Sequence, residues 1–528
     1  MFRPAAGRQG TGRVPSSATW ISAGLLVLVA ALSLWLRQSG LAQSGFVSHD
    51  VGGILYNAMV LLDGGLPYID TVELKAPGTF YLASLVAPPE GRGIEDFQCW
   101  ANLWATAGML ATAGLAWSLW GRRAAVATAL LVVLHAGFLD SMDANYVTWT
   151  LLPQVLAMTM ALLATRSQSI WRTLLLWGVA GLFAAIATLF KRPAGVVLIV
   201  LIAWALFGGR GARKQRHLQG AASVLLGFAA GHAPIALHYG MHGELAGLVD
   251  GYVLNQWGSR YVSARHQPLL AELRDGVFAS AYFLGLPLAM AAFTVMASLR
   301  DPKRRRETTW VLVWLLAALG SAAVGMRFYQ GYFLTALPPV CLLAAAPWGL
   351  LGSRFSRGKW TQIILIAPLL VLFLRQSWML EGTRKRRGLS RDQGAQAVAN
   401  HIKNRTVDGE KIWVWGWHLW GVYSLADRRS ASAIYKSWGL LTTPNDNTWR
   451  RSGTRSTFVD GPAAAKLLDD FETDPPAYIV LGSSVPHRDF SKLHRFIQER
   501  YSRDRSLTLG RVQFWRHLDP PVSGNGPQ

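Results

Sequence analysis

The feature that most constrains this chain is a series of apolar runs, each as long as a helix that crosses a bilayer. A transmembrane helix needs roughly 20 apolar residues. Hydrophobic residues make up 51% of the 528 residues and charged residues only 16%, a charge content too low for a soluble domain of this size. We therefore predict a polytopic α-helical membrane protein with about eleven transmembrane helices. The expected spans lie near residues 19–37, 98–120, 124–140, 149–165, 172–190, 194–208, 217–237, 276–298, 308–326, 332–350 and 360–379.

The net charge of +22 is distributed in a way that predicts the orientation in the membrane. Basic residues gather in short connectors, such as Arg122 with Arg123 and the run from Lys303 to Arg306. With a cytoplasmic N-terminus, these clusters fall on the cytoplasmic side, as the positive-inside rule requires. We expect a multi-pass protein of a cell membrane, the inner or plasma membrane of a bacterium, with the first span kept as an uncleaved anchor. Membrane topology thus accounts for the basic residues, and nucleic-acid binding is not needed.

The character of the sequence changes near residue 384, where apolar runs shorten and charged residues return. Helical patterns over 391–403 and 463–471 alternate with strand patterns over 411–416, 475–482 and 511–517. Strands that alternate with helices predict a small α/β domain. We therefore divide the chain into a transmembrane domain, 1–383, and a C-terminal domain, 384–528. An odd number of spans makes this second domain extracytoplasmic.

The first external loop, residues 38–97, carries most of the charge that topology does not explain. Asp50, Asp63, Asp70, Glu73 and Lys75 surround a short apolar helical pattern there. Charges so close to a bilayer are costly and often mark function, so we predict a catalytic loop. Two structural alternatives are open: Asp50 fits the N-cap of that helix, and Asp70 or Glu73 could pair with Lys75. The neighbouring His49 would orient a partner or bind a metal, although a lone histidine has no metal-ligand spacing.

Three further segments carry charged or aromatic residues at the outer ends of predicted spans. Lys191 and Arg192 interrupt one apolar stretch, Arg327 lies beside Tyr329 and Tyr332, and another external loop holds Arg260. The structural alternative is that each of these cations and tyrosines only anchors its span at the membrane interface. A phosphate group at the outer leaflet would explain why cations from distant segments gather there, because Lys and Arg donate charge-assisted hydrogen bonds to its oxygens.

The order of residues in the first loop resembles a known family. Asp50 is followed by GGLPYIDTVELKAPGTFYL, which places Lys75 and Pro77 in a lysine–proline pattern before an aromatic run. This resembles the first external loop of the polyprenyl-phosphate-sugar-dependent glycosyltransferases of the C-type superfamily, in the branch of protein O-mannosyltransferases and aminoarabinose transferases. Residues 327–339 resemble a second segment of that family, and 411–435 and 475–482 resemble its external domain.

The chain departs from the family pattern in two places. The usual lysine–proline–proline is Lys-Ala-Pro here, and the acid of the second external loop has no clear counterpart, with Asp140 and Asp143 as candidates. We therefore assign no metal ligand, and the question of a divalent metal stays open.

The resemblance implies a chemistry for the residues above. The donor is a polyprenyl-phosphate sugar, and the acceptor is a hydroxyl of a glycan, lipid or protein, with membrane lipids as further partners and no nucleic acid. Asp50 acts as the base, in a displacement that inverts the sugar. The remaining roles are phosphate binding by Lys75, Lys191, Arg192 and Arg327, and support by His49, Asp70, Glu73, Asp143, Arg260, Tyr329 and Tyr332.

Other classes of membrane protein also fit part of the pattern. A transporter or flippase of lipid-linked or anionic substrates has many spans and buried charges. Its charges would lie nearer the bilayer midplane, often in repeated halves, and this chain has no visible repeat. A lipid-linked glycan ligase or polymerase shares the donor but would lack the early loop and the C-terminal domain.

Overall fold

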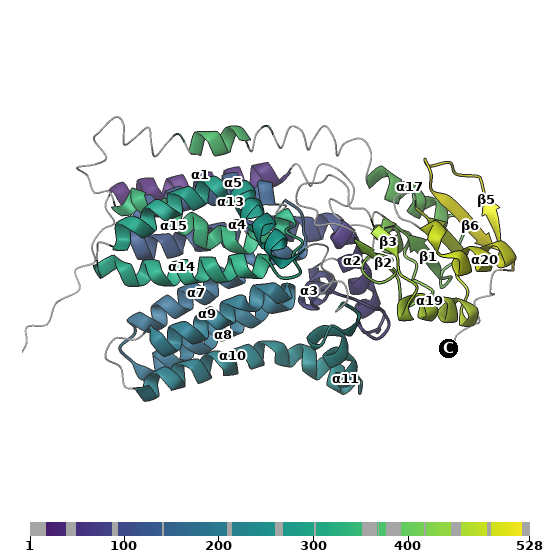
Figure 1. Ribbon diagram of the computed structural model, residues 1–528, viewed down its shortest axis with the longest axis horizontal. Coiled ribbons are helices and arrows are strands. Elements are labelled where there is room, and N and C mark those ends of the chain that lie inside the picture. Colours follow the sequence, from purple (N-terminus) through teal and green to yellow (C-terminus); the bar gives the residue numbers. More distant parts are fainter. Residues whose placement is uncertain are drawn as a thin grey trace, which may run out of the picture.

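The computed structural model shows a long helical bundle with a small α/β domain at one of its ends (Figure 1). The helices α2 and α3 of the first loop lie between these two parts. The structure describes residues 17–38, 49–86, 93–139, 142–208, 214–258, 268–299, 302–350, 367, 369–375, 378, 392–416, 419–444, 456–482 and 487–519.

Long helices build the bundle. They are α1 (Ser17–Gln38), α4 (Gly93–Trp120), α5 (Arg122–Ala136), α7 (Leu151–Arg166), α8 (Ile170–Phe190), α9 (Val196–Phe207), α10 (Lys214–Met241), α13 (Leu269–Leu299), α14 (Pro302–Ala322) and α15 (Leu337–Leu350). Shorter elements connect them: α6 (Tyr146–Trp149), α11 (Leu245–Leu248), η1 (Gly137–Leu139), η2 (Arg192–Gly195), the π-helix η3 (Val249–Val253), η4 (Gln256–Gly258) and η5 (Gln330–Ala336).

The polytopic helical architecture predicted from the apolar runs is confirmed, but the count of eleven spans is not. Within the described residues, seven helical stretches are long and apolar enough to cross a membrane. The predicted spans at 98–120 and 308–326 fall in α4 and α14, which carry charged residues in or near their first turns. The span expected at 194–208 is the shorter α9, and most of 360–379 lies outside the described residues.

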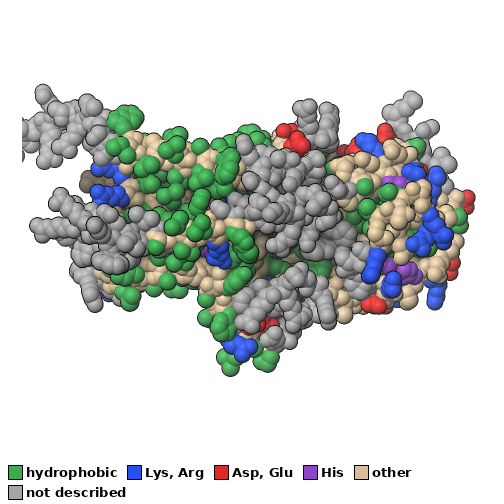
Figure 2. All heavy atoms as spheres, turned by 90° about the horizontal axis from the view of Figure 1, so that it is seen from above, with side chains coloured by type: hydrophobic (Ala, Val, Ile, Leu, Met, Phe, Trp, Pro, Cys, Tyr) green, Lys and Arg blue, Asp and Glu red, His purple; other side chains and the backbone are tan. Residues whose placement is uncertain are grey.

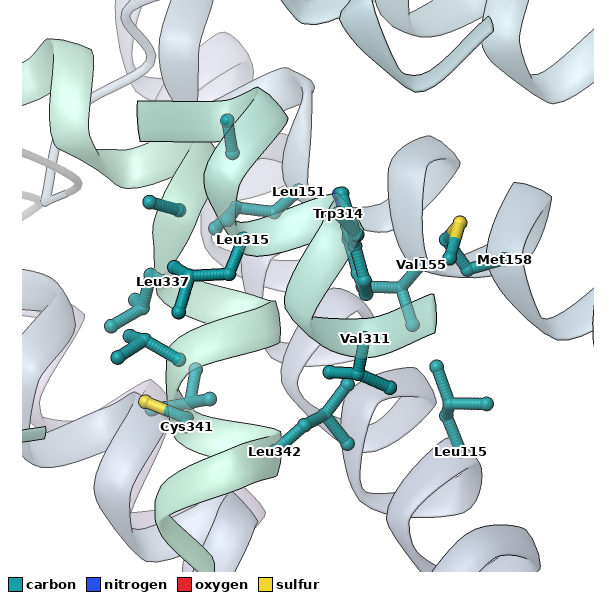
Figure 3. Close-up of a cluster of buried hydrophobic side chains, with 14 of the residues drawn as sticks. Leu115, Leu151, Val155, Met158, Val311, Trp314, Leu315, Leu337, Cys341 and Leu342 are labelled. Carbon is teal, nitrogen blue, oxygen red and sulfur yellow. The ribbon is translucent and has the colours of Figure 1, made fainter. Parts of the chain in front are cut away.

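Side chains explain how the bundle packs and which surface it offers to lipid. The interior between α7, α14 and α15 is filled by Leu151, Trp314 and Leu337, all buried (Figure 3). Large apolar side chains also face outward, including Trp171, 80% exposed, and Leu226, 71% exposed. In the space-filling view, hydrophobic side chains cover much of the bundle side (Figure 2). An apolar outer surface of this extent is expected for a protein solvated by lipid.

The basic connectors predicted to share one membrane side do lie together. Arg122 Nη1 donates to Thr19 Oγ1 over 2.9 Å, which joins the start of α5 to the start of α1. Arg166 forms a 2.6 Å ion pair with Glu307, which joins the end of α7 to the first part of α14. Lys and Arg side chains appear at the bundle end farthest from the C-terminal domain (Figure 2). The C-terminal domain therefore lies at the opposite end from these connectors.

The C-terminal domain is built on a four-stranded sheet with the order β1-β4-β6-β5. The strand β1 (Ile412–Trp415) runs parallel to β4 (Tyr478–Leu481), and β6 (Gln513–His517) is antiparallel to both β4 and β5 (Tyr501–Asp504). A two-stranded sheet pairs β2 (Thr442–Pro444) with β3 (Ser456–Phe458). The remaining elements are α17 (Asp392–Lys403), α18 (Gly421–Ala426), α19 (Pro462–Thr473), η8 (His487–Asp489) and α20 (Ser491–Arg500).

The helices and strands predicted for this domain are confirmed. Among the elements that were not predicted are β5 and α20. Neither has the continuous apolar run that marks β1 and β4, since β5 is Tyr-Ser-Arg-Asp and its second and third residues are exposed. The predicted domain boundary at residues 383 and 384 lies outside the described residues.

The first loop contains α2 (His49–Leu62) and α3 (Gly78–Val86). Gly64 has a φ of 79°, which a glycine adopts without steric cost, and it lies just after the end of α2. Gly52 lies so close to α18 that an added Cβ would meet the backbone nitrogen of Gly421 at 2.6 Å. This contact, together with a 3.0 Å hydrogen bond from the Ser430 N–H to Tyr56 Oη, packs the first loop against the C-terminal domain.

Candidate functional site

The candidate site lies where the first loop, the start of α6 and the segment 430–436 of the C-terminal domain meet. The helix α2 lines it on one side, and η2 with the loop after η3 lies on the other. Most charged residues predicted for the site belong to these segments.

Asp50 is half-buried in the first turn of α2, where the positive end of the helix dipole favours a carboxylate. Its Oδ2 accepts a hydrogen bond from Asn145 Nδ2 over 3.2 Å. The backbone N–H of the same Asn145 donates to Asp143 Oδ1 over 3.3 Å, and Asp143 is buried. The structure thus brings two predicted acids, Asp50 and Asp143, to opposite sides of one asparagine.

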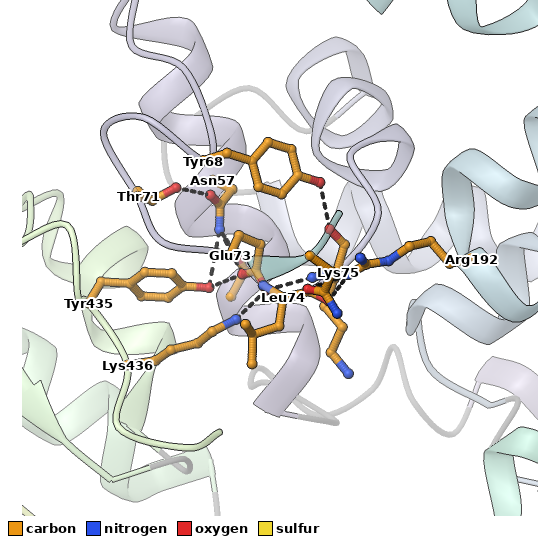
Figure 4. A network of polar contacts seen from close by, with 11 residues as sticks. Asn57, Tyr68, Thr71, Glu73, Leu74, Lys75, Arg192, Tyr435 and Lys436 are labelled. Carbon is orange, nitrogen blue, oxygen red and sulfur yellow. Dashed lines mark hydrogen bonds and ion pairs between the residues drawn. The ribbon is translucent and has the colours of Figure 1, made fainter. Parts of the chain in front are cut away.

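Glu73 is fully buried and binds residues of the C-terminal domain rather than the side chain of Lys75. Its carboxylate forms an ion pair with Lys436 Nζ and accepts a hydrogen bond from Tyr435 Oη (Figure 4). Asn57 Nδ2 of α2 donates to the same carboxylate over 3.3 Å. Asp70 caps its own turn by accepting from the N–H of Leu66 over 2.6 Å. The two acids that were alternatives for pairing with Lys75 therefore have other partners.

Burial shifts the protonation equilibria of the groups around Glu73. Desolvation lowers the pKa of Lys436 below its usual value, and the adjacent Glu73 carboxylate opposes that shift. Desolvation, together with the same carboxylate, raises the pKa of Tyr435 well above its usual value. Tyr435 is therefore a neutral hydrogen-bond donor at physiological pH.

Lys75 is half-buried, and its side chain leads away from the Glu73 carboxylate (Figure 4). Its Nζ lies 5.6 Å from the centre of the Tyr146 ring, at the start of α6. A cation over an aromatic face is weakly attracted to it. Because Asn145 and Tyr146 are consecutive, Asp50 and Lys75 both contact the beginning of α6.

Lys191 and Arg192 have different surroundings although they are adjacent in the chain. Lys191 Nζ lies 4.2 Å from the centre of the Tyr332 ring, and this ring packs edge-on against Tyr329. The Arg192 guanidinium donates to the backbone oxygens of Leu74 and Tyr252 and to the side chain of Asn255. Arg192 therefore holds the first loop against the loop that follows η3.

Arg327 is almost completely buried, with 2% of its surface exposed, in a segment of unusual backbone geometry. Gly325, Met326 and Phe328 have φ angles of 78°, 51° and 50°. Such angles cost a non-glycine residue roughly 1–3 kcal/mol and are often found at functional sites. The segment leads into η5, which packs against α6 and carries the Tyr332 that contacts Lys191.

Some predicted site residues lie beyond what the structure describes. Arg260 and Asp140 fall in segments outside the described residues, and His49 is described as the first residue of α2 without its side chain. Among the residues that are described, no three His, Cys, Asp or Glu side chains form a group that could hold a metal ion.

Four residues of the site were not predicted from the sequence: Asn57, Asn145, Tyr435 and Lys436. Asn57, Asn145 and Tyr435 are uncharged, and Lys436 is a single lysine outside any recognised motif. All four become notable only through their contacts in the structure. One clue was available for Lys436. The neighbouring residues in IYKSW are mostly large and apolar, as in a buried segment, and a lysine is rarely buried without a partner.

The fold and the site together define a multi-pass membrane protein with a polar site between its helical bundle and a small α/β domain. No protein-family model matches the chain, and no curated protein sequence matches it. Solved structures of an archaeal oligosaccharyltransferase and of ArnT do match it, and the chain shares the fold of these proteins. The fold implied by the first-loop resemblance is therefore confirmed.

Two proteins illustrate the likeness. ArnT from Cupriavidus metallidurans in the apo state has a TM-score of 0.60 at 13% identity, over 97% of this chain and 100% of that one. The same protein bound to undecaprenyl phosphate has a TM-score of 0.59. The apo oligosaccharyltransferase from Archaeoglobus fulgidus has a TM-score of 0.56 at 14% identity, over 87% of this chain and 69% of that one.

Proposed function

We propose that the protein is a membrane glycosyltransferase that moves a sugar from a polyprenyl-phosphate donor to a hydroxyl of an extracytoplasmic acceptor. The observation that carries this proposal is the meeting of Asp50 and Lys75 at the start of α6. This meeting point adjoins the C-terminal domain, at the bundle end opposite the basic connectors. The same fold in ArnT has been solved with undecaprenyl phosphate, which supports a lipid phosphate as ligand.

The cations of the site suit the leaving group of this reaction. When the bond between the anomeric carbon and the phosphate oxygen breaks, that oxygen keeps the electron pair and negative charge develops on it. Preorganised cations stabilise such charge most effectively in a water-poor site. We assign this role to Lys75, Lys191 and Arg327, while Arg192 adds positive charge and holds the first loop through its hydrogen bonds.

Asp50 suits the role of the base. The acceptor oxygen forms its bond to the anomeric carbon while its proton passes to a carboxylate, and Asp50 is half-buried beside the proposed phosphate site. The hydrogen bond from Asn145 Nδ2 to Oδ2 helps to orient this carboxylate. A single displacement of this kind inverts the anomeric centre. Asp143, on the far side of Asn145, would support this arrangement.

The orientation follows from the same arrangement. A cytoplasmic N-terminus puts the basic connectors in the cytoplasm and both the site and the C-terminal domain outside. The donor is then a sugar lipid of the outer leaflet, and the acceptor is a glycan, a lipid or a protein of the cell envelope. Whether the sugar is a hexose or a pentose depends on contacts in the donor pocket.

The proposal is tested by incubating the purified full-length protein in lipid nanodiscs with a panel of polyprenyl-phosphate sugars. We expect release of polyprenyl phosphate from at least one donor, and loss of this release in Asp50→Asn. Binding of lipid phosphate without release from any donor, even with a mixed envelope extract as acceptor, would contradict the proposal. Movement of a labelled donor between leaflets without cleavage would indicate a flippase.

A further inference from the structure

Two residues of the C-terminal domain, Tyr435 and Lys436, reach the Glu73 carboxylate of the first loop. Glu73 Oε1 accepts hydrogen bonds from the backbone N–H groups of Leu74, over 2.6 Å, and Lys75, over 3.1 Å. The same oxygen forms the ion pair with Lys436, and Oε2 accepts from Tyr435 and Asn57. A carboxylate offers about four lone-pair sites. The acceptor capacity of Glu73 is therefore fully used, and two of its partners come from the C-terminal domain.

The carbonyl groups of the same two residues are also held. The Arg192 guanidinium donates to the Leu74 oxygen, and Tyr68 Oη donates to the Lys75 oxygen over 2.6 Å. The chain then continues through Ala76 to Pro77, whose ring fixes its own φ and restricts the residue before it. All four backbone polar groups of residues 74 and 75 therefore have fixed partners, and the starting point of the Lys75 side chain is set.

Removal of Lys436 would leave the Glu73 carboxylate without its charged partner. Lys436 and Glu73 are both buried, with side chains 4% and 0% exposed, so an unpaired Glu73 carboxylate would be poorly solvated. It would shift toward water or toward its remaining donors, and the two amides that it accepts would move with it. Lys436 does not belong to the bundle, yet its ammonium is paired with a carboxylate of a bundle-side loop.

We propose that Lys436 of the C-terminal domain is a positioning residue for the transfer reaction: it fixes the Glu73 carboxylate, which fixes the main chain of Lys75 and thereby the ammonium that meets the donor phosphate. This inference rests on the proposed function. It assigns the C-terminal domain a part in the active site that does not depend on binding either substrate. Misplacement of a positioned group by about 1 Å can cost on the order of 100-fold in rate.

The test is a double-mutant cycle of Lys436→Met, Glu73→Gln and the double variant, in the full-length protein. We expect Lys436→Met to lower kcat for polyprenyl-phosphate release on the order of 100-fold. In the Glu73→Gln background the same change should lower kcat by no more than about threefold further, because Lys436 acts through Glu73. The matched control is Lys411→Met, which removes an ion pair to Asp474 in the same domain, between side chains 42% and 43% exposed.

A second measurement is independent of turnover. Hydrogen exchange of the peptide 70–78 should accelerate in Lys436→Met, because the Leu74 and Lys75 amides lose a fixed acceptor, and should be unchanged in Lys411→Met. If Lys436→Met does not fold, the double variant, which leaves no unpaired charge, and Tyr435→Phe, which removes one donor to Glu73, take its place. A normal kcat or unchanged exchange in folded Lys436→Met overturns the inference. It is also overturned if Lys436→Met lowers kcat by the same factor in the wild type and in the Glu73→Gln background. Absence of turnover in the wild type would instead refute the proposed function, and exchange alone would then decide whether Lys436 orders the loop.

Discussion

Asp50 and Asn145 are joined by a 3.2 Å hydrogen bond, although they are 95 residues apart in the chain. The bond ties the first turn of α2 to the residue that precedes α6. It helps to fix the orientation of the Asp50 carboxylate, and the adjacent Tyr146 ring lies 5.6 Å from Lys75 Nζ. The geometry of the proposed base thus depends on two loops of the transmembrane domain.

The first prediction concerns this carboxylate. Asp50→Asn should lower the rate of polyprenyl-phosphate release at least 1,000-fold, at the lower end of what a general base and its orientation contribute together. The melting temperature should change little, because an amide can keep one acceptor for Asn145. The control is Asp63→Asn, at a half-exposed acid 3.8 Å from Arg429. Substantial activity in folded Asp50→Asn would reduce Asp50 to a helix-end residue.

The second prediction separates the two ends of the bundle. Replacement of Lys191 and Arg192 by Met should weaken binding of polyprenyl phosphate at least tenfold, since a hydrogen bond to a charged group contributes about 1.5–3 kcal/mol. The same replacement of Arg122 and Arg123, in the basic connector before α5, should leave binding within threefold. Titration of the lipid phosphate against each variant in nanodiscs provides the measurement. Equal losses in both pairs would mean that Lys191 and Arg192 are interfacial anchors.

Local sequence patterns were sufficient for the elements whose signal is continuous. The strands β1 and β4 are uninterrupted apolar runs, and α8 carries its one charged residue, Arg172, in the first turn, so the type of each element follows from length and composition. The number of spans did not follow in the same way. Helices such as α4, which begins Gly-Ile-Glu-Asp, combine apolar length with charged ends, and hydropathy does not separate a span from a long helix packed against other helices.

The partners in the site could be predicted only in part, because they are distant in the sequence. Glu73 was recognised as a candidate, but its ion-pair partner Lys436 is 363 residues away, and no pattern in a single sequence joins the two. The segment 411–435 that carried the family resemblance ends one residue before Lys436. Arg192 was assigned to phosphate from its position at a span end, whereas its contacts to Leu74 and Tyr252 emerge from the fold.

The third prediction concerns the contact between α2 and α18. Gly52→Ala should destabilise the protein by roughly 1–3 kcal/mol, because its Cβ would lie 2.6 Å from the Gly421 nitrogen and backbone cannot yield as a flexible side chain can. Turnover should fall with it, since α2 carries Asp50. The control is Gly114→Ala in α4, where nothing lies within 4 Å of the added Cβ. Thermal melting of both variants gives the comparison. Equal melting temperatures for Gly52→Ala and the wild type would contradict this account of the interface.

The fourth prediction is a loss of C-terminal domain stability in mild acid. Burial, with His494 beside it, lowers the pKa of His487 to about 4, and burial also lowers the pKa of His401. An unfolded histidine titrates near 6.5, so as the pH falls below that value the unfolded state binds protons that the folded state does not. Stability is therefore fully present above about pH 6.5 and declines toward pH 4. Tryptophan fluorescence melts of the full-length protein at pH 7.5 and 5 should show a lower melting temperature in acid, and this difference should shrink in the double variant His401→Asn with His487→Asn. An undiminished difference in that variant would assign the acid sensitivity to other groups.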